Sequence, residues 1–123
     1  MGRSLRGVAA VAAALAATAT FAPAAFAHVE LKSSTPKAKS TVRKPSSVKL
    51  TFTGPIRSGT LTVKSSSGSS ATSGKGGRDP RNINRLTVPL KSGLKAGKYT
   101  VKASITAADG HKESFTFWFK IKT

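Results

Sequence analysis

The sequence contains no cysteine, and its only methionine is Met1. Disulfides, thiolate metal sites and cysteine nucleophiles are therefore excluded, and soft sulfur ligands for metals are absent beyond the first residue. Acidic residues are also scarce, because Glu30, Asp79, Asp109 and Glu113 oppose 21 lysines and arginines, which gives a formal net charge of +17. With no disulfide available, the stability of the fold has to come from packing of its core.

The sequence also lacks an apolar run long enough to cross a membrane. Residues 8–21 carry no charge and follow a basic first segment, but fourteen residues are too few to span ~30 Å of hydrocarbon comfortably as a helix. A small-x-small cleavage site follows at 25–27. We therefore interpret residues 1–27 as a secretion signal that is removed, rather than as an uncleaved anchor. Residues 28–123 are then one exported domain, either periplasmic or outside the cell and associated with its wall.

Removal of Arg3 and Arg6 with the signal lowers the net charge from +17 to +15. Such a balance favours anionic neighbours, which for an exported protein are wall polymers or lipid headgroups rather than nucleic acid. The basic residues are scattered from Lys32 to Lys122, without a helical stripe or interleaved aromatic residues, so no nucleic-acid site is predicted. The alternative is that the charge only keeps the surface soluble.

Apolar and polar residues alternate with a period of two in five segments, which is the pattern of strands with one buried face. These segments are residues 48–52, 61–64, 86–90, 99–106 and 115–121. Glycine and proline turn signals separate them, and no segment has a helical period. With a first strand near 29–33, the sequence predicts an all-β protein: a small immunoglobulin-like Greek-key β-sandwich of about seven antiparallel strands. A small barrel remains the alternative.

The stretch from residue 65 to residue 84 is rich in glycine and serine. It predicts a mobile loop or a long hairpin excursion. A phosphate-binding loop is rejected, because the required motif and its strand-to-helix context are both missing.

The sequence has two histidines, and cleavage after residue 27 would make His28 the amino terminus. An amino-terminal histidine offers its α-amine and its Nδ1 atom, which together close a six-membered ring around a metal. The free amine has a pKa of about 7.7 to 8.0, so a metal displaces its proton easily near neutral pH. The second histidine, His111, follows Asp109 by two residues, and the two side chains could project together.

The amine, two imidazoles and a carboxylate form an N3O set of ligands, which suits tetragonal Cu(II), although Zn(II) could also use it. Each piece has an ordinary explanation as well. Asp109-Gly110 alone is more often a tight turn, and a lone His111 is usually a surface residue. Their agreement with the cleavage site leaves no histidine unexplained.

Four segments resemble the CopC family of exported copper-binding proteins: AHVELKSSTPKAKSTV, PSSVKLTFTGPI, LKAGKYTV and AADGHKESFTFWFKI. The resemblance covers nearly all of 28–123 and is weakest over 65–84. It implies an immunoglobulin-like sandwich with a Cu(II) site made of His28, Asp109 and His111. Some members of the family place an acidic residue where this chain has Gly54, and others have a methionine-rich Cu(I) site. We therefore expect at most one Cu(II) site here, and no direct transfer between a Cu(I) site and a Cu(II) site.

The function expected from these observations is binding of Cu(II) for copper resistance, storage or delivery, by a monomer without catalytic activity. The partners are the copper ion and a membrane copper transporter, of the kind that the resemblance implies. The main alternative is a basic structural module that binds the cell wall or another polyanion, with weak or lost metal binding. An oxidative enzyme with a histidine brace is disfavoured because aromatic residues are few. A hydrolase is disfavoured because no base and nucleophile pair with a supporting group is visible.

Overall fold

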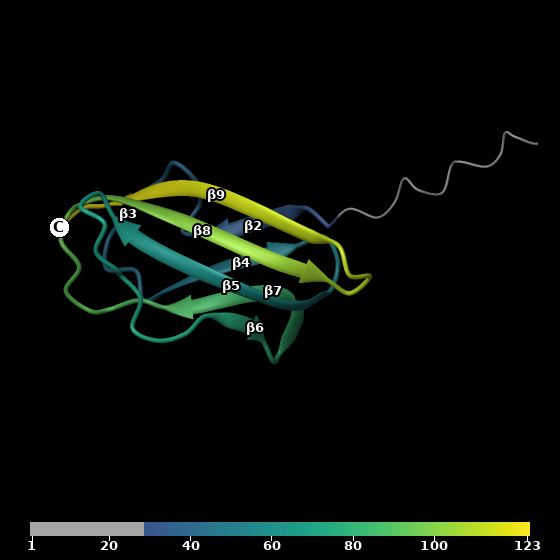
Figure 1. Ribbon diagram of the computed structural model, residues 1–123. Coiled ribbons are helices and arrows are strands. Elements are labelled where there is room, and N and C mark those ends of the chain that lie inside the picture. The colour runs from purple at the N-terminus through teal and green to yellow at the C-terminus, as the bar shows by residue number, and fades with distance from the viewer. Residues whose placement is uncertain (1–28) are drawn as a thin grey trace, which may run out of the picture.

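A computed structural model describes residues 29–123 and contains two β-sheets packed face to face (Figure 1). The described residues contain no helix, and hence none that could cross a membrane. The first sheet is made of β2 (Leu31–Thr35), β4 (Ser47–Phe52), β7 (Asn82–Pro89) and β6 (Gly77–Asp79), in that order. The second is made of β3 (Thr41–Val42), β9 (Lys112–Ile121), β8 (Gly97–Ala107) and β5 (Ile56–Ser65).

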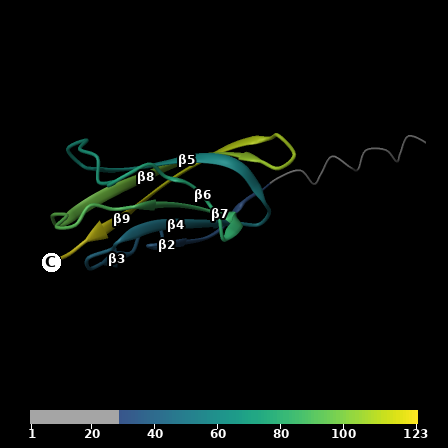
Figure 2. The ribbon, with the colours of Figure 1, turned by 90° about the horizontal axis from the view of Figure 1, so that it is seen from below.

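The two separate sheets confirm the predicted sandwich and exclude the barrel alternative. Eight strands are present in the described part of the chain, against about seven expected. All pairs are antiparallel except one, because the two-residue β3 runs parallel to the end of β9. The view in Figure 2 shows the two layers from their edge.

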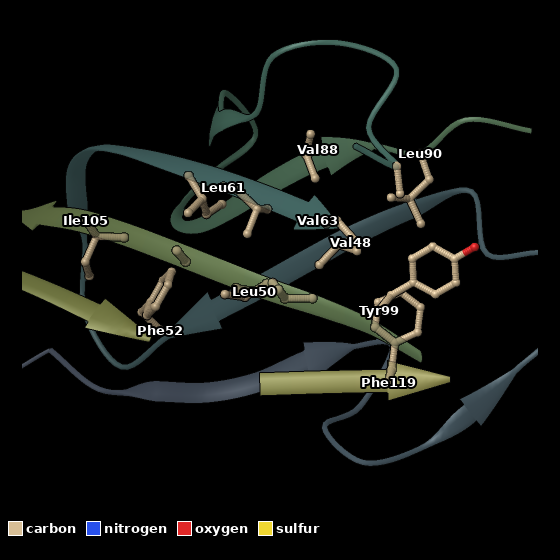
Figure 3. Packing of buried hydrophobic residues seen from close by; sticks show 14 of the residues in the cluster. Val48, Leu50, Phe52, Leu61, Val63, Val88, Leu90, Tyr99, Ile105 and Phe119 are labelled. Atoms are coloured by element: carbon tan, nitrogen blue, oxygen red, sulfur yellow. The ribbon is translucent and has the colours of Figure 1, made fainter. Parts of the chain in front are cut away.

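The core fills the space between the sheets with the inward side chains of the alternating segments (Figure 3). On β8, for example, Tyr99, Val101 and Ile105 are buried, while Lys98 and Lys102 are exposed. This is the outcome of the period-two pattern, since successive side chains of a strand point to opposite faces. Burial of each large apolar side chain contributes about 1.5 to 3 kcal/mol relative to its exposure.

The most deeply buried aromatic rings lie at separate points of this core. Phe52 and Phe119 are 1% and 0% exposed. Tyr99 stacks on Phe119 with ring centroids 5.8 Å apart, and its hydroxyl donates a hydrogen bond to the Lys95 carbonyl at 2.7 Å. The phenol is therefore buried with its polar atom satisfied, which avoids the cost of an unpaired hydroxyl.

The glycine- and serine-rich segment 65–84 is more ordered in its hydrogen bonding than a featureless loop. It contains β6 and the start of β7, which form the predicted excursion as an antiparallel pair. Ala71 is 1% exposed, its amide donates to the Val63 carbonyl, and its carbonyl accepts from the Lys91 amide, both at 2.8 Å. A small side chain can occupy the core without standing out in an apolar pattern, so the sequence alone did not identify this contact.

Strand β5 begins five residues earlier than the alternation at 61–64 predicts. The early part contains Gly59, where an added Cβ would lie 2.9 Å from the Ser104 carbonyl oxygen of β8. The close approach of the two strands requires a residue without a side chain. A glycine that is needed for packing therefore interrupted the apolar pattern.

Candidate metal centre

The turn between β8 and β9 carries two of the residues that the sequence singled out as metal ligands. The Ala107 amide donates to the His111 carbonyl at 2.8 Å, and the Gly110 amide donates to the Ala107 carbonyl at 2.9 Å. Gly110 has a φ of 95°, a region that residues with a side chain rarely adopt. Asp109-Gly110 is therefore a tight turn, as its sequence predicts, and the turn lifts Asp109 and His111 away from the sheet.

Within this turn the two side chains contact each other. The Asp109 carboxylate accepts a hydrogen bond from the His111 amide at 3.0 Å through Oδ1, and its Oδ2 lies 3.0 Å from His111 Nδ1. Both side chains are open to solvent, with 45% of Asp109 and 56% of His111 exposed. The hydrogen bond from the His111 amide, together with the imidazole, holds the pKa of Asp109 below its usual value. The carboxylate therefore stays ionised in mildly acidic solution.

The contact also determines which imidazole nitrogen is available. Nδ1 of His111 faces the carboxylate at 3.0 Å, which leaves Nε2 on the other side of the ring. A carboxylate beside one ring nitrogen fixes the orientation of the ring and makes the other nitrogen a better ligand. The arrangement can thus present Nε2 of His111 to an incoming metal, with a carboxylate oxygen beside it.

The connection from β4 to β5 holds this turn in place. The Ala108 amide donates to the Pro55 carbonyl at 3.1 Å, and Arg57 donates through Nη2 to the Ala108 carbonyl at 2.8 Å. The same connection also fixes the start of the described chain. Glu30 and Thr53 exchange two hydrogen bonds of 2.9 Å, from the Glu30 amide to Thr53 Oγ1 and from the Thr53 amide to the Glu30 carbonyl.

The start of the described chain and the β8–β9 turn consequently lie at the same end of the sandwich, as Figures 1 and 2 both show. The structure thus brings Asp109 and His111 together, while His28 lies outside the described residues. Among residues 29–123, no three or more side chains of His, Cys, Asp or Glu form a group that could hold a metal. Sequence reasoning missed the roles of Thr53 and Arg57, which carry no signal because they bond to backbone far along the chain.

Gly54, the position where a carboxylate is missing, lies in this same connection. An added Cβ there would meet only Val29 Cγ2, at 3.5 Å, which is an ordinary van der Waals contact. The φ of Gly54 is not in the left-handed region, so a side chain would not strain the backbone. The backbone at position 54 therefore accepts a residue with a Cβ atom.

All four acidic residues of the sequence lie at this end of the molecule. Glu30 is hydrogen-bonded to Thr53 just after β4, Asp79 precedes the turn into β7, and Glu113 is the second residue of β9. Since β4 and β7 are antiparallel, the end of β4 lies beside the start of β7. The carboxylates at this end reduce the positive potential around Asp109 and His111, with Asp79 already paired to Arg85 at 3.9 Å.

The CopC domain model matches residues 31–122, which is most of the chain and includes every strand found within residues 29–123. The chain belongs to the CopC family. The resemblance noted in the sequence is thereby confirmed, together with the sandwich fold that it implied.

Solved CopC-family structures superpose on this chain over nearly their whole length. CopC from Methylosinus trichosporium OB3b has a TM-score of 0.65 and 26% identity, covering 77% of this chain and 94% of its own. PcoC from Escherichia coli, described as a methionine-rich copper resistance protein, has a TM-score of 0.64 and 28% identity, covering 78% and 100%. Protein YobA of Escherichia coli K12 is 30% identical over 129 residues, covering 98% of this chain and 96% of its own. Unlike the methionine-rich PcoC, this CopC-family chain has only Met1.

Proposed function

We propose that this CopC-family protein is exported and binds Cu(II) as part of copper resistance, without catalysis. The observation that carries the proposal is the pairing of Asp109 and His111, 3.0 Å apart, at the end of the sandwich where the described chain begins. Its membership of a family that includes a copper resistance protein supports copper as the metal.

The proposed ligands are the α-amine and imidazole of His28, the imidazole of His111 and the carboxylate of Asp109. Glu30 follows His28 by two positions, so chain connectivity alone limits the distance between their Cα atoms to about 7 Å. The hydrogen bonds between Glu30 and Thr53 hold that segment beside the connection that also binds the β8–β9 turn. The donor set fits Cu(II), which favours nitrogen and oxygen ligands in a tetragonal arrangement.

Cleavage of residues 1–27 is part of the proposal, because the α-amine of His28 does not exist before it. The mature protein would then be a monomeric domain of residues 28–123, periplasmic or associated with the wall. It would sequester Cu(II) or deliver it to a membrane copper transporter. An exposed site suits transfer to a partner, since both Asp109 and His111 are accessible from solvent.

The test is an intact-mass measurement on the exported protein, followed by a titration with Cu(II). We expect a mass that corresponds to a chain starting at His28, and saturation at about one equivalent of copper with the spectrum of a tetragonal nitrogen- and oxygen-ligated site. An amino terminus at any other residue, or no saturable binding, would contradict the proposal. Titration with Zn(II) measures selectivity, and Cu(II) is expected to bind more tightly according to the usual affinity order.

The replacement Gly54→Asp is expected to tighten Cu(II) binding by about tenfold. The new carboxylate would stand beside the proposed site without a steric conflict, and about 1.4 kcal/mol of added attraction corresponds to that factor. The matched control is Gly54→Asn, which has nearly the same shape and no charge. Competition titrations of both variants measure the effect, and equal affinities for Asp and Asn would refute a role for the charge.

A further inference from the structure

The end of the sandwich opposite the proposed copper site contains a pocket of about 420 Å³. We call it the basic pocket. It is lined by five serines of the segment that follows β5 and by the connection into β8: Ser65, Ser66, Ser67, Ser69 and Ser70, with residues 91–99. Its charged residues are Lys91, Lys95 and Lys98, and its lining includes no carboxylate. Leu94, Ala71 and Ala96 also line it, so the only side-chain charges in this concave site are positive and hydroxyl groups stand beside them, which suits an oxyanion.

The serines of the basic pocket retain capacity for a ligand. Ser65, Ser67 and Ser69 are joined hydroxyl to hydroxyl by hydrogen bonds of 2.9 and 3.4 Å. Three hydroxyls carry three donors, and two of these donors are used in the two bonds. One O–H of this chain is therefore available to donate to an oxygen atom in the pocket.

Lys98 connects the basic pocket to the outer face of the second sheet. Its Nζ lies 4.9 Å from the centre of the Trp118 ring, and Nζ of Lys120 lies 5.7 Å from the same ring. Lys98 and Lys120 are direct cross-strand partners, an arrangement in which like charges repel. The ring attracts both ammonium groups and holds them near each other. An anion placed between them would relieve the repulsion.

The charge distribution separates this end from the copper site. The four carboxylates of the sequence all lie at the other end, whereas Lys91, Lys95 and Lys98 line the basic pocket and Lys120 stands opposite Lys98 on the neighbouring strand. Strand β8 links the two ends, and its 11 residues at about 3.3 Å each separate them by roughly 30 Å. The electrostatic potential is therefore strongly positive at the end with the basic pocket and less positive at the end with the carboxylates.

We propose that the basic pocket and the Lys98–Trp118–Lys120 cluster form a docking surface for a polymer of repeated phosphate groups. The lysines supply the charge, the serines supply donors to phosphate oxygens, and the flat sheet face allows an extended chain to continue beyond the pocket. Docking by this end leaves Asp109 and His111 exposed at the other.

Other anionic partners fit less well. A lipid bilayer favours an apolar anchor, but the single exposed large hydrophobic residue of the described chain is Ile83, which belongs to β7 in the other sheet. Single-stranded nucleic acid favours free aromatic rings for base stacking, and Trp118 is already covered by two ammonium groups. A phosphate polymer needs neither feature.

The test uses the exported protein and immobilised long-chain inorganic polyphosphate as the probe. Lys98→Gln with Lys120→Gln should weaken binding by about tenfold at low salt and lower the slope of log K against log salt by about two. The matched control, Lys32→Gln with Lys49→Gln, removes the same charge from β2 and β4 and should weaken binding less than threefold. Equal losses in both double variants would overturn the proposal, because binding would then follow net charge alone.

Three further comparisons test the role of Trp118, the identity of the partner, and the independence of this surface from the copper site. Trp118→Leu should weaken polyphosphate binding and Trp118→Phe should largely retain it, since a phenyl ring still attracts the ammonium groups. Stronger binding to anionic lipid vesicles or to single-stranded DNA than to polyphosphate would overturn the choice of partner. Cu(II) affinity of the Lys98 and Lys120 variant should stay unchanged, so a failure here is distinguishable from a failure of the copper proposal.

Discussion

Addition of one residue ahead of His28 in the proposed mature chain is expected to lower its Cu(II) affinity by at least about a hundredfold. The added residue converts the α-amine into an amide, which removes one ligand nitrogen and opens the six-membered chelate ring. Loss of an outer-shell partner of a metal ligand already costs about 10- to 100-fold in affinity, so the loss of a ligand should cost at least the upper value. Competition titration against a chelator of known affinity measures the change.

The control for this experiment is the same residue added after Thr123. That end of the chain, marked C in Figure 1, lies at the far end of the sandwich from the β8–β9 turn, which carries Asp109 and His111, so copper binding should not change. Tight binding that survives in the amino-terminal extension would refute the amine chelate. Copper would then have to be bound by His111 and Asp109 with the His28 side chain alone.

The fold was predictable because its core is encoded by simple alternation. Val48, Leu50 and Phe52 alternate with exposed or half-buried polar residues, and all three are at most 1% exposed. A period of two fixes which side chains face inward, and the turn residues fix where strands end. The parts that escaped prediction are those where packing requires a small residue, such as Gly59 and Ala71, because such residues have no apolar signal of their own.

The candidate site was predictable only in its chemistry. The candidate metal ligands could be identified because few residues of this kind are present: the sequence has two histidines and four acidic residues, and Asp109 stands two positions from His111. The spacing did not reveal that the carboxylate faces Nδ1, because this depends on the turn conformation set by Gly110. Nor did it reveal the hydrogen bond from Arg57, which joins residues 51 positions apart in the sequence.

The gathering of all four carboxylates at one end also depends on topology. The sequence disperses these residues along 84 positions, from Glu30 to Glu113. They lie at the same end of the sandwich because antiparallel strands return repeatedly to that end. From the sequence, the net charge of +17 argues against a cation site. The folded arrangement weakens that objection, since the field at a site depends on where the charges lie rather than on their sum.

His111→Ala is expected to lower Cu(II) affinity by at least about a hundredfold, with little effect on the stability of the fold. The His111 side chain is 56% exposed and its Nδ1 faces Asp109, while the hydrogen bonds that close the turn use the backbone of His111 and would persist. Copper titration and urea unfolding of the variant measure the two effects separately. A matched control is Lys112→Ala, which removes a neighbouring cation and should leave affinity the same or slightly higher.

Measurement of copper binding while the pH is lowered distinguishes the contributions of the proposed ligands. Asp109 has a pKa below its usual value in the metal-free fold, so it remains ionised while the pH falls through the range where nitrogen ligands take up protons. Release of copper from the unmodified protein should therefore follow protonation of the amine and imidazoles. Asp109→Asn should weaken binding at neutral pH without altering the shape of the curve of bound copper against pH. A change in the shape of that curve would instead mean that protonation of the carboxylate controls the release of copper. Asp109 would then be the ligand that determines copper retention in acid.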